Sequence, residues 1–129
     1  MERQGLEPVK RVGYWEYDFA KDGGAIGTIT LRGDALPSGA VITNGMIHVH
    51  TAVVSAGAAT VSFHQAVAQD IRANTLQGVL LLNALLDVIP AGTAATSIRN
   101  LTQGNQLKMI IGVAALTAGK IVVALEYYA

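Results

Sequence analysis

The sequence contains no cysteine, which excludes disulfides, thiolate metal sites and cysteine nucleophiles. Charged residues make up only 14% of the 129 residues, against roughly 25% in ordinary soluble domains. Nine basic and nine acidic residues cancel, so charge is not expected to drive binding to nucleic acid or to an anionic membrane. Aromatic residues are scarce at 5%, while hydrophobic residues reach 51%. The apolar excess is therefore aliphatic and predicts an oligomer or a capping role, because large apolar patches associate.

Long apolar runs are also absent. The longest, Val79 to Ile89, is interrupted by Asn83 and Asp87 and is shorter than the roughly 18 residues of a membrane span. The first dozen residues mix charges of both signs and do not resemble a signal peptide. We therefore expect a soluble protein that does not contact a membrane and is not exported by the usual secretion route.

The length suits one domain with a core of its own. Residues 1–12 carry Gly5 and Pro8 among charges and show no periodicity, so we expect an extended N-terminal arm followed by a β domain at 13–129. Arms of this kind often lie on a neighbouring subunit.

Alternating residues predict the strands. From Tyr14 to Phe19, the aromatic residues Trp15, Tyr17 and Phe19 fall on one face, which is the period of a half-buried strand. In the strand at 41–54 we expect a bulge at Asn44-Gly45 in preference to a tight hairpin, because alternation resumes directly afterwards. Further strands are expected at 25–31, 59–65, 95–101, 107–116 and 120–128, with a loop at 32–39 and turns at 55–57, 90–94, 102–105 and 117–119.

Two β-hairpins are predicted, one joining 41–54 to 59–65 and one joining 107–116 to 120–128 through Thr117-Ala118-Gly119. Residues 66–89 suit a short helix or buried strands, and strands are favoured because Gly78 interrupts the helical pattern. Seven to nine short strands separated by turn signals predict a mostly β fold, either an antiparallel β-sandwich of jelly-roll-like form or a small β-barrel.

The first predicted hairpin would place three histidines on one outer surface. Ile47 and Val49 share the inward face with Val61 and Phe63, and this register puts His48, His50 and His64 together on the other face. Three imidazoles there would bind zinc, or would loosen an interface when protonated near pH 6. The favoured interpretation is that they are ordinary surface histidines, so we predict neither a metal nor any other cofactor.

Catalytic motifs are missing. The sequence has no Gly-x-Ser-x-Gly elbow, and the glycine-rich stretch 23–27 lacks the following Lys-Ser or Lys-Thr of a phosphate-binding loop. The tripeptide Arg32-Gly33-Asp34 matches a signal that some cell-surface receptors recognise, but three residues match often by chance. We therefore expect a protein that is not an enzyme.

Two stretches carry a resemblance. Residues 17–39 read YDFAKDGGAIGTITLRGDALPSG, and residues 113–120 read VAALTAGK before an apolar strand that ends in Glu126-Tyr127-Tyr128. Together they resemble small structural proteins of tailed bacteriophages, which tend to be encoded near the major capsid protein. Such proteins resemble head decoration or cement proteins, commonly trimeric β domains on the capsid surface. The resemblance implies a virion structural protein that binds the major capsid protein as a homotrimer, is assembled in the host cytoplasm and has no family catalytic residues.

On this interpretation, the arm and the first strand make the contacts with partners. The alternative is a receptor-binding or carbohydrate-binding β domain of a head fibre or tail, which would use Trp15 and the loop near Arg32 and Asp34. Alternating aromatics more often fill a sandwich core or a subunit contact. The candidate partner-binding residues are Arg3, Leu6, Val9, Arg11, Tyr14, Trp15 and Tyr17.

Overall fold

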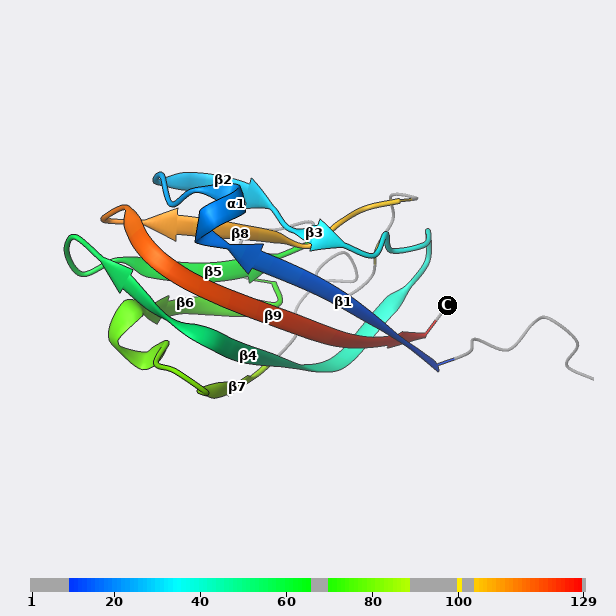
Figure 1. Cartoon of the computed structure of the whole chain (residues 1–129). Helices are drawn as coiled ribbons and strands as arrows, with labels where there is room; N and C mark the ends of the chain where they lie inside the picture. Colours follow the sequence, from blue (N-terminus) through cyan, green and yellow to red (C-terminus); the bar gives the residue numbers. More distant parts are fainter. Residues whose placement is uncertain (1–9, 66–69, 89–99, 101–103, 129) are drawn as a thin grey trace, which may run out of the picture.

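A computed structural model describes residues 10–65, 70–88, 100 and 104–128. Two antiparallel sheets lie face to face (Figure 1). Sheet A has the order β3-β1-β9-β4-β7, and sheet B has the order β2-β8-β5-β6. No helix of the described residues has the length and apolar character needed to span a bilayer. The elements are β1 (Lys10–Asp18), α1 (Phe19–Asp22), β2 (Gly27–Thr30), β3 (Arg32–Gly33), β4 (Val41–Ser55), β5 (Thr60–His64), β6 (Arg72–Leu76), the 3-10 turn η1 (Gln77–Val79), β7 (Leu85–Asp87), β8 (Lys108–Gly112) and β9 (Leu116–Tyr128).

The strand pairing is nested. The first strand pairs with the last, β1 with β9, and then β2 pairs with β8, β4 with β7 and β5 with β6. Strand β9 also pairs with β4, and β8 with β5, which completes the two sheets. Two four-stranded sheets connected in this way form a jelly roll, to which β3 adds a short edge strand. The predicted β-sandwich is confirmed, and the described strands do not close into a barrel.

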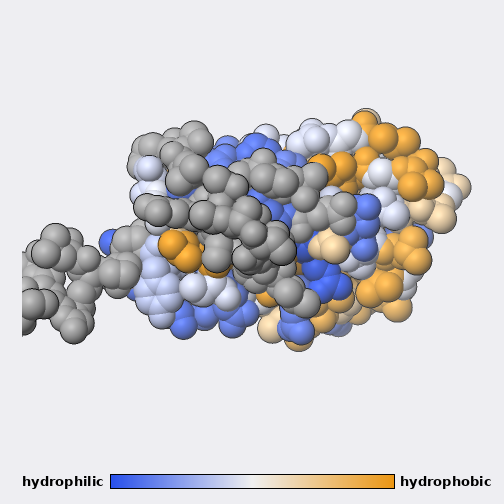
Figure 2. All heavy atoms as spheres, turned by 180° about the vertical axis from the view of Figure 1, so that it is seen from behind, coloured by the Kyte–Doolittle hydropathy of each residue, from blue (hydrophilic) through white to orange (hydrophobic). Residues whose placement is uncertain are grey.

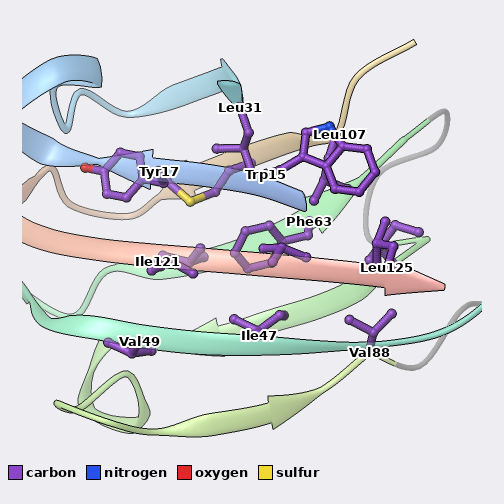
Figure 3. Packing of buried hydrophobic residues seen from close by; sticks show 14 of the residues in the cluster. Trp15, Tyr17, Leu31, Ile47, Val49, Phe63, Val88, Leu107, Ile121 and Leu125 are labelled. Carbon is purple, nitrogen blue, oxygen red and sulfur yellow. The ribbon is translucent and has the colours of Figure 1, made fainter. Parts of the chain in front are cut away.

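Alternate residues of the strands fill the space between the two sheets, and over most of β1, β4, β5, β8 and β9 these are the odd-numbered ones. Successive side chains of a strand point to opposite faces, so each strand contributes every second residue to the core (Figure 3). Burying one large side chain of this kind contributes about 1.5–3 kcal/mol. The central residues include Trp15 and Tyr17 of β1, Ile47 and Val49 of β4, Val61 and Phe63 of β5, Met109 and Ile111 of β8, and Ile121, Val123 and Leu125 of β9.

The predicted hairpin of 41–54 with 59–65 is wrong. Strands β4 and β5 belong to different sheets, and the chain crosses from one sheet to the other through residues 56–59. The alternation that suggested a hairpin is real, because both strands turn their odd-numbered residues inward. Two facing sheets of a sandwich produce this pattern just as two paired strands do.

The second predicted hairpin is wrong for the same reason, since β8 lies in sheet B and β9 in sheet A. The chain turns at residues 113–115, where Val113 has φ 71°, and Thr117-Ala118-Gly119 lies within β9. Gly119 has φ 143°, and a Cβ added there would lie 2.9 Å from Cγ2 of Val53. This glycine therefore allows close approach of β9 to β4.

Two other expectations change at element boundaries. Strand β1 begins at Lys10, so the last three residues of the expected arm are strand, because β9 continues to Tyr128 and offers them a pairing partner. The predicted loop at 32–39 contains β3, which pairs with β1. The remainder of the arm, 1–9, lies outside the described residues.

The helix α1 occupies the end of the first predicted strand. Phe19 begins this single turn, because the side chain of Asp18 caps it by accepting a hydrogen bond from the backbone N–H of Ala20. The bulge expected at Asn44-Gly45 is confirmed by a register shift between Ile42 and Asn44 where β4 meets β9.

The segment 66–89 is described from residue 70 to residue 88, where it forms β6, η1 and β7. The preference for strands is confirmed, with one 3-10 turn between them. The turn predicted at 90–94 lies outside the described residues, as does the strand predicted at 95–101 apart from Asn100. The side-chain amide of Asn100 donates to the carbonyls of Leu36 and Pro37.

Candidate interaction surface

The three histidines do not come together. His48 and His50 are close neighbours on β4, with ring centroids 4.3 Å apart, whereas His64 is buried on β5 in the other sheet. The predicted cluster depended on the hairpin, and facing sheets send the even-numbered residues of β4 and β5 to opposite outer sides. Among the described residues, no group of three His, Cys, Asp or Glu side chains is placed to hold a metal ion.

The surroundings of His64 favour its neutral form. Burial lowers its pKa and nearby Lys108 lowers it further, while the charge of Asp70 acts in the opposite direction. Its Nδ1 atom is buried and finds no hydrogen-bond partner in the described structure. This histidine is a structural residue at the edge of the core and is not available to a partner.

The outer face of sheet A presents side chains from all five of its strands. Strand register places them in three rows, each row running across the sheet. The central strand β9 contributes Val122 and Ala124 to the first two rows and Glu126 to the third. The rows are Arg32–Glu16–Val122–His48–Leu85, Tyr14–Ala124–Met46–Asp87 and Val12–Glu126–Asn44.

Tyr14 stands between two shallow hollows on this face. Its side chain is 58% exposed, and it lines both depressions, of about 330 Å³ and about 300 Å³. The first is bordered by Glu16 and Arg32, and the second by Met46 and Glu126 among others. An exposed tyrosine with an apolar ring, a polar hydroxyl and concave surface on both sides is typical of a protein contact.

Ion pairs fix the margin of this face beside β3. The guanidinium of Arg32 donates from Nη2 to Oδ2 of Asp22 at 2.9 Å and from Nε to Oδ1 at 3.1 Å, and it lies 3.4 Å from Glu16. Hydrogen bonding to Arg32 lowers the pKa of Asp22, and the same bonds raise the pKa of Arg32. Across the sheet, Lys10 pairs with Glu126 at 3.2 Å.

The neighbouring Tyr17 anchors α1 from inside. Its hydroxyl donates to the carbonyl of Gly23 at 2.6 Å. Burial, together with the negative charges of Asp22 and Asp18, raises the pKa of Tyr17 to about 12. The phenol therefore stays protonated and keeps this bond throughout the physiological range.

The candidate contact residues divide between surface and core. Tyr14 and Arg11 are exposed, whereas Trp15 and Tyr17 are 1% and 0% exposed and fill the core. The two buried aromatics are therefore corrected from contact residues to core residues, because odd-numbered positions of β1 face sheet B. The remaining candidates, Arg3, Leu6 and Val9, lie outside the described residues.

Sequence reasoning missed the contributions of other strands to this face. Met46, Leu85 and Val122 come from β4, β7 and β9, and they join Tyr14 only through sheet pairing. For Met46 and Val122, the available signal was an apolar residue at an even-numbered position of a strand whose odd-numbered positions are core.

The tripeptide Arg32-Gly33-Asp34 serves the fold. Arg32 is engaged by Asp22 and Glu16, and Oδ2 of Asp34 accepts a hydrogen bond from the backbone N–H of Tyr14 at 2.9 Å. Gly33 has φ 157°, and a Cβ added there would lie 2.1 Å from the carbonyl oxygen of Tyr14. These three residues form the corner that attaches β3 to β1.

No family model matches this sequence, and the search of curated proteins found no match. Solved structures do share its fold. A chain of the "Cyanophage Pam1 capsid asymmetric unit" matches with a TM-score of 0.68 and 15% identity over 99% of this chain and 90% of that one. A chain of the "Acidic stable capsid structure of Helicobacter pylori bacteriophage KHP30" matches with a TM-score of 0.63 and 15% identity, over 96% of this chain and 90% of that one. A chain of the "Capsid of Ralstonia phage GP4" matches with a TM-score of 0.57 and 16% identity, over 92% of this chain and 84% of that one.

Proposed function

We propose that this chain is a virion structural protein of a tailed bacteriophage, a decoration or cement subunit that binds the major capsid protein on the outer surface of the head. The observation that carries this proposal is the shared fold, since a chain of a phage capsid matches 99% of this one with a TM-score of 0.68. The neighbours support a capsid-related protein, and the resemblance in 17–39 and 113–120 supports the decoration role. Assembly would take place in the host cytoplasm.

The outer face of sheet A is suited to binding a shell. It combines an exposed apolar centre at Tyr14 and Met46 with ion-paired margins at Arg32 and Glu126. Charged margins of this kind set the register of a contact, while the apolar centre supplies most of its free energy. In a homotrimer the same weak contact is made three times at once, which raises the avidity well above that of one copy.

The proposed role of the arm now applies to residues 1–9 with Arg11 beside them, because Lys10–Val12 belong to β1. Arg3, Leu6 and Val9 remain the candidate contacts with the shell or with a neighbouring subunit. Removal of residues 1–9 leaves every described strand intact, so it tests binding separately from folding.

The primary test is the composition of purified particles. We expect this chain in a fixed ratio to the major capsid protein, with threefold-symmetric density in a reconstruction of the head. Its absence from particles, or its presence at a tail in a few copies, would overturn the proposal.

A binding assay then assigns the surface. Purified protein is mixed with particles that lack it, and bound protein is quantified after sedimentation. We expect Tyr14→Ala and deletion of 1–9 each to weaken binding at least tenfold, while Thr28→Ala, an exposed change on sheet B, binds normally. Undiminished binding by Tyr14→Ala would show that the outer face of sheet A is not the shell contact.

The second candidate is a receptor-binding or carbohydrate-binding domain of a head fibre or tail. It is favoured by one observation, the hollow in which Tyr14 lies beside Glu16 and Arg32. Trp15 cannot take the stacking role proposed from the sequence, because it is buried. Binding on a glycan array that is lost in Tyr14→Ala would favour this function. For either candidate we propose a protein without enzymatic activity.

A further inference from the structure

The four connections at one end of the sandwich contain no charged residue, and Asp22 and Lys120 lie at its border. The connections from α1 to β2, β4 to β5, β6 to β7 and β8 to β9 all lie at this end, on the left of Figure 1. With the adjoining strand ends they comprise residues 23–31, 51–61, 73–86 and 109–119, and none of these is Asp, Glu, Lys or Arg. All 18 charged residues of the chain therefore fall elsewhere.

Exposed aliphatic side chains gather at this end, which appears as the hydrophobic right-hand side of Figure 2. Each is 45% exposed or more, and together they present apolar area on the order of the several hundred Å² that marks an interaction site on a soluble protein. We call the following set the uncharged end: Ile26, Val54, Leu76, Val79, Leu81, Leu82 and Val113.

Hydrogen bonds join the four connections into one surface. The N–H of Leu116 donates to the carbonyl of Gly24 at 2.8 Å, and that of Ala56 donates to the carbonyl of Ala115 at 3.3 Å. The side chain of Gln77 donates to the carbonyl of Val53 at 2.8 Å. These bonds hold the aliphatic side chains on a defined framework.

Val113 is a second and independent observation. It has φ 71°, a left-handed conformation that is unfavourable for a β-branched residue and is ordinarily occupied by Gly, Asn or Asp. Its side chain is nevertheless 73% exposed and does not pack in the core. An apolar side chain kept at a strained and exposed position points to a contact made outside the chain.

Residues 1–9 are too few to reach the uncharged end. Strand β1 begins at the opposite end of the sandwich, and nine extended residues reach at most about 32 Å. Strand β9 alone, with 13 residues, spans about 43 Å between the two ends. Residues 1–9 therefore do not cover these aliphatic side chains.

We propose that the uncharged end is the surface through which copies of this chain associate with one another. A charge-free aliphatic surface suits association around a threefold axis, because no ionic group loses its hydration when the same ends of three copies meet. The inference deepens and rests on the proposed homotrimer, and it leaves the outer face of sheet A and the arm free to bind the shell.

The test measures the mass of the free protein in solution by light scattering and sedimentation, without any capsid. We expect an oligomer that Val113→Asn dissociates, with a fall of at least tenfold in the association constant. Asparagine suits φ 71°, so this variant should keep or raise the thermal stability of the dissociated chain. A loss of association thus cannot be confused with failure to fold.

Leu82→Asn provides a second change on the same surface, and Met46→Asn on the outer face of sheet A is the matched control. Dissociation by Met46→Asn with no effect of the other two variants would overturn the proposal, as would a wild-type protein that stays monomeric at about 100 µM, far above useful binding constants. Flotation of the monomer with neutral phosphatidylcholine vesicles would overturn it in favour of a lipid surface. Particle binding is assayed separately, so a stable oligomer that fails to bind particles would contradict only the capsid function.

Discussion

The outer face of sheet A and the uncharged end are both exposed and partly apolar, but they are built differently. The face lies on paired strands, with Tyr14 and Met46 on either side of the central strand β9 and ion pairs of Arg32 and Lys10 at its margins. The uncharged end lies on connections between strands and has neither aromatic nor ionic side chains among its defined residues.

This difference separates two kinds of contact. Charges and hydrogen-bonding groups penalise any arrangement that leaves them unpaired, so the sheet A face is suited to one orientation on one partner. Aliphatic burial is non-directional and scales with area, so the uncharged end is suited to a permanent contact with the same end of other copies. The substitutions and the change of salt described below are expected to affect one of these two regions more than the other, or to affect both by unfolding the protein.

The largest effect is expected from Trp15→Ala. Removing this fully buried indole should lower the free energy of unfolding by about 3–5 kcal/mol, and both surfaces would be lost with the fold. The adjacent Tyr14→Ala should change stability by less than about 0.5 kcal/mol, because that side chain is largely in water. Urea unfolding of the two variants measures the contrast, and similar losses would contradict the assignment of inside and outside faces on β1.

A smaller effect is expected from Arg32→Ala. This change leaves Asp22 without its bidentate partner, and it should cost about 1 kcal/mol of stability and weaken particle binding, with no effect on self-association. Equilibrium unfolding and light scattering measure both quantities. Loss of the oligomer in Arg32→Ala would show that the two regions are coupled.

The pH dependence of stability should follow His64. Because burial lowers its pKa in the folded protein below 6.5, the unfolded chain takes up a proton first as the pH falls. Stability is thus fully present above about pH 6.5 and declines below it. Unfolding at a series of pH values should show this decline, and His64→Gln should flatten it. A flat wild-type profile would contradict the burial of this ring.

The smallest effect is expected from salt on self-association. Between about 0.05 and 0.5 M NaCl, the mass distribution of the free protein should change little, because the uncharged end contains no charged residue. Particle binding through the sheet A face should change more over the same range. Self-association and particle binding are measured over the same salt titration. Equal salt dependence of the two would show that the sheet A face and the uncharged end do not differ in this respect.

Local pattern predicted much of the fold. Alternation located β1, β4, β5 and β9 within a few residues, and the resumed alternation after Asn44-Gly45 predicted the bulge. Pairing was not predictable, because a strand that buries its odd-numbered residues gives the same pattern whether the next strand is beside it or across the core. The prediction of a histidine cluster was wrong only because of this ambiguity.

The candidate surface was predicted only through β1. Aromatics occupy both faces of that strand, and the sequence did not show whether Tyr14 or Trp15 faces water. The structure decides this through Val123 and Ile121 of β9, which pair with Trp15 and Tyr17 and face the core with them. The uncharged end depends on connections that are separate in sequence and adjacent only in the folded molecule.

The position of β9 sets an order of events during synthesis. It is the last described strand, yet it lies at the centre of sheet A, and β1 and β4 are linked only through it. A nascent chain therefore keeps both of those strands with open edges until Leu116–Tyr128 has left the ribosome. The turn that carries Val113 is also made at that late stage. Chains that stop before Leu116 thus lack part of the surface proposed for self-association.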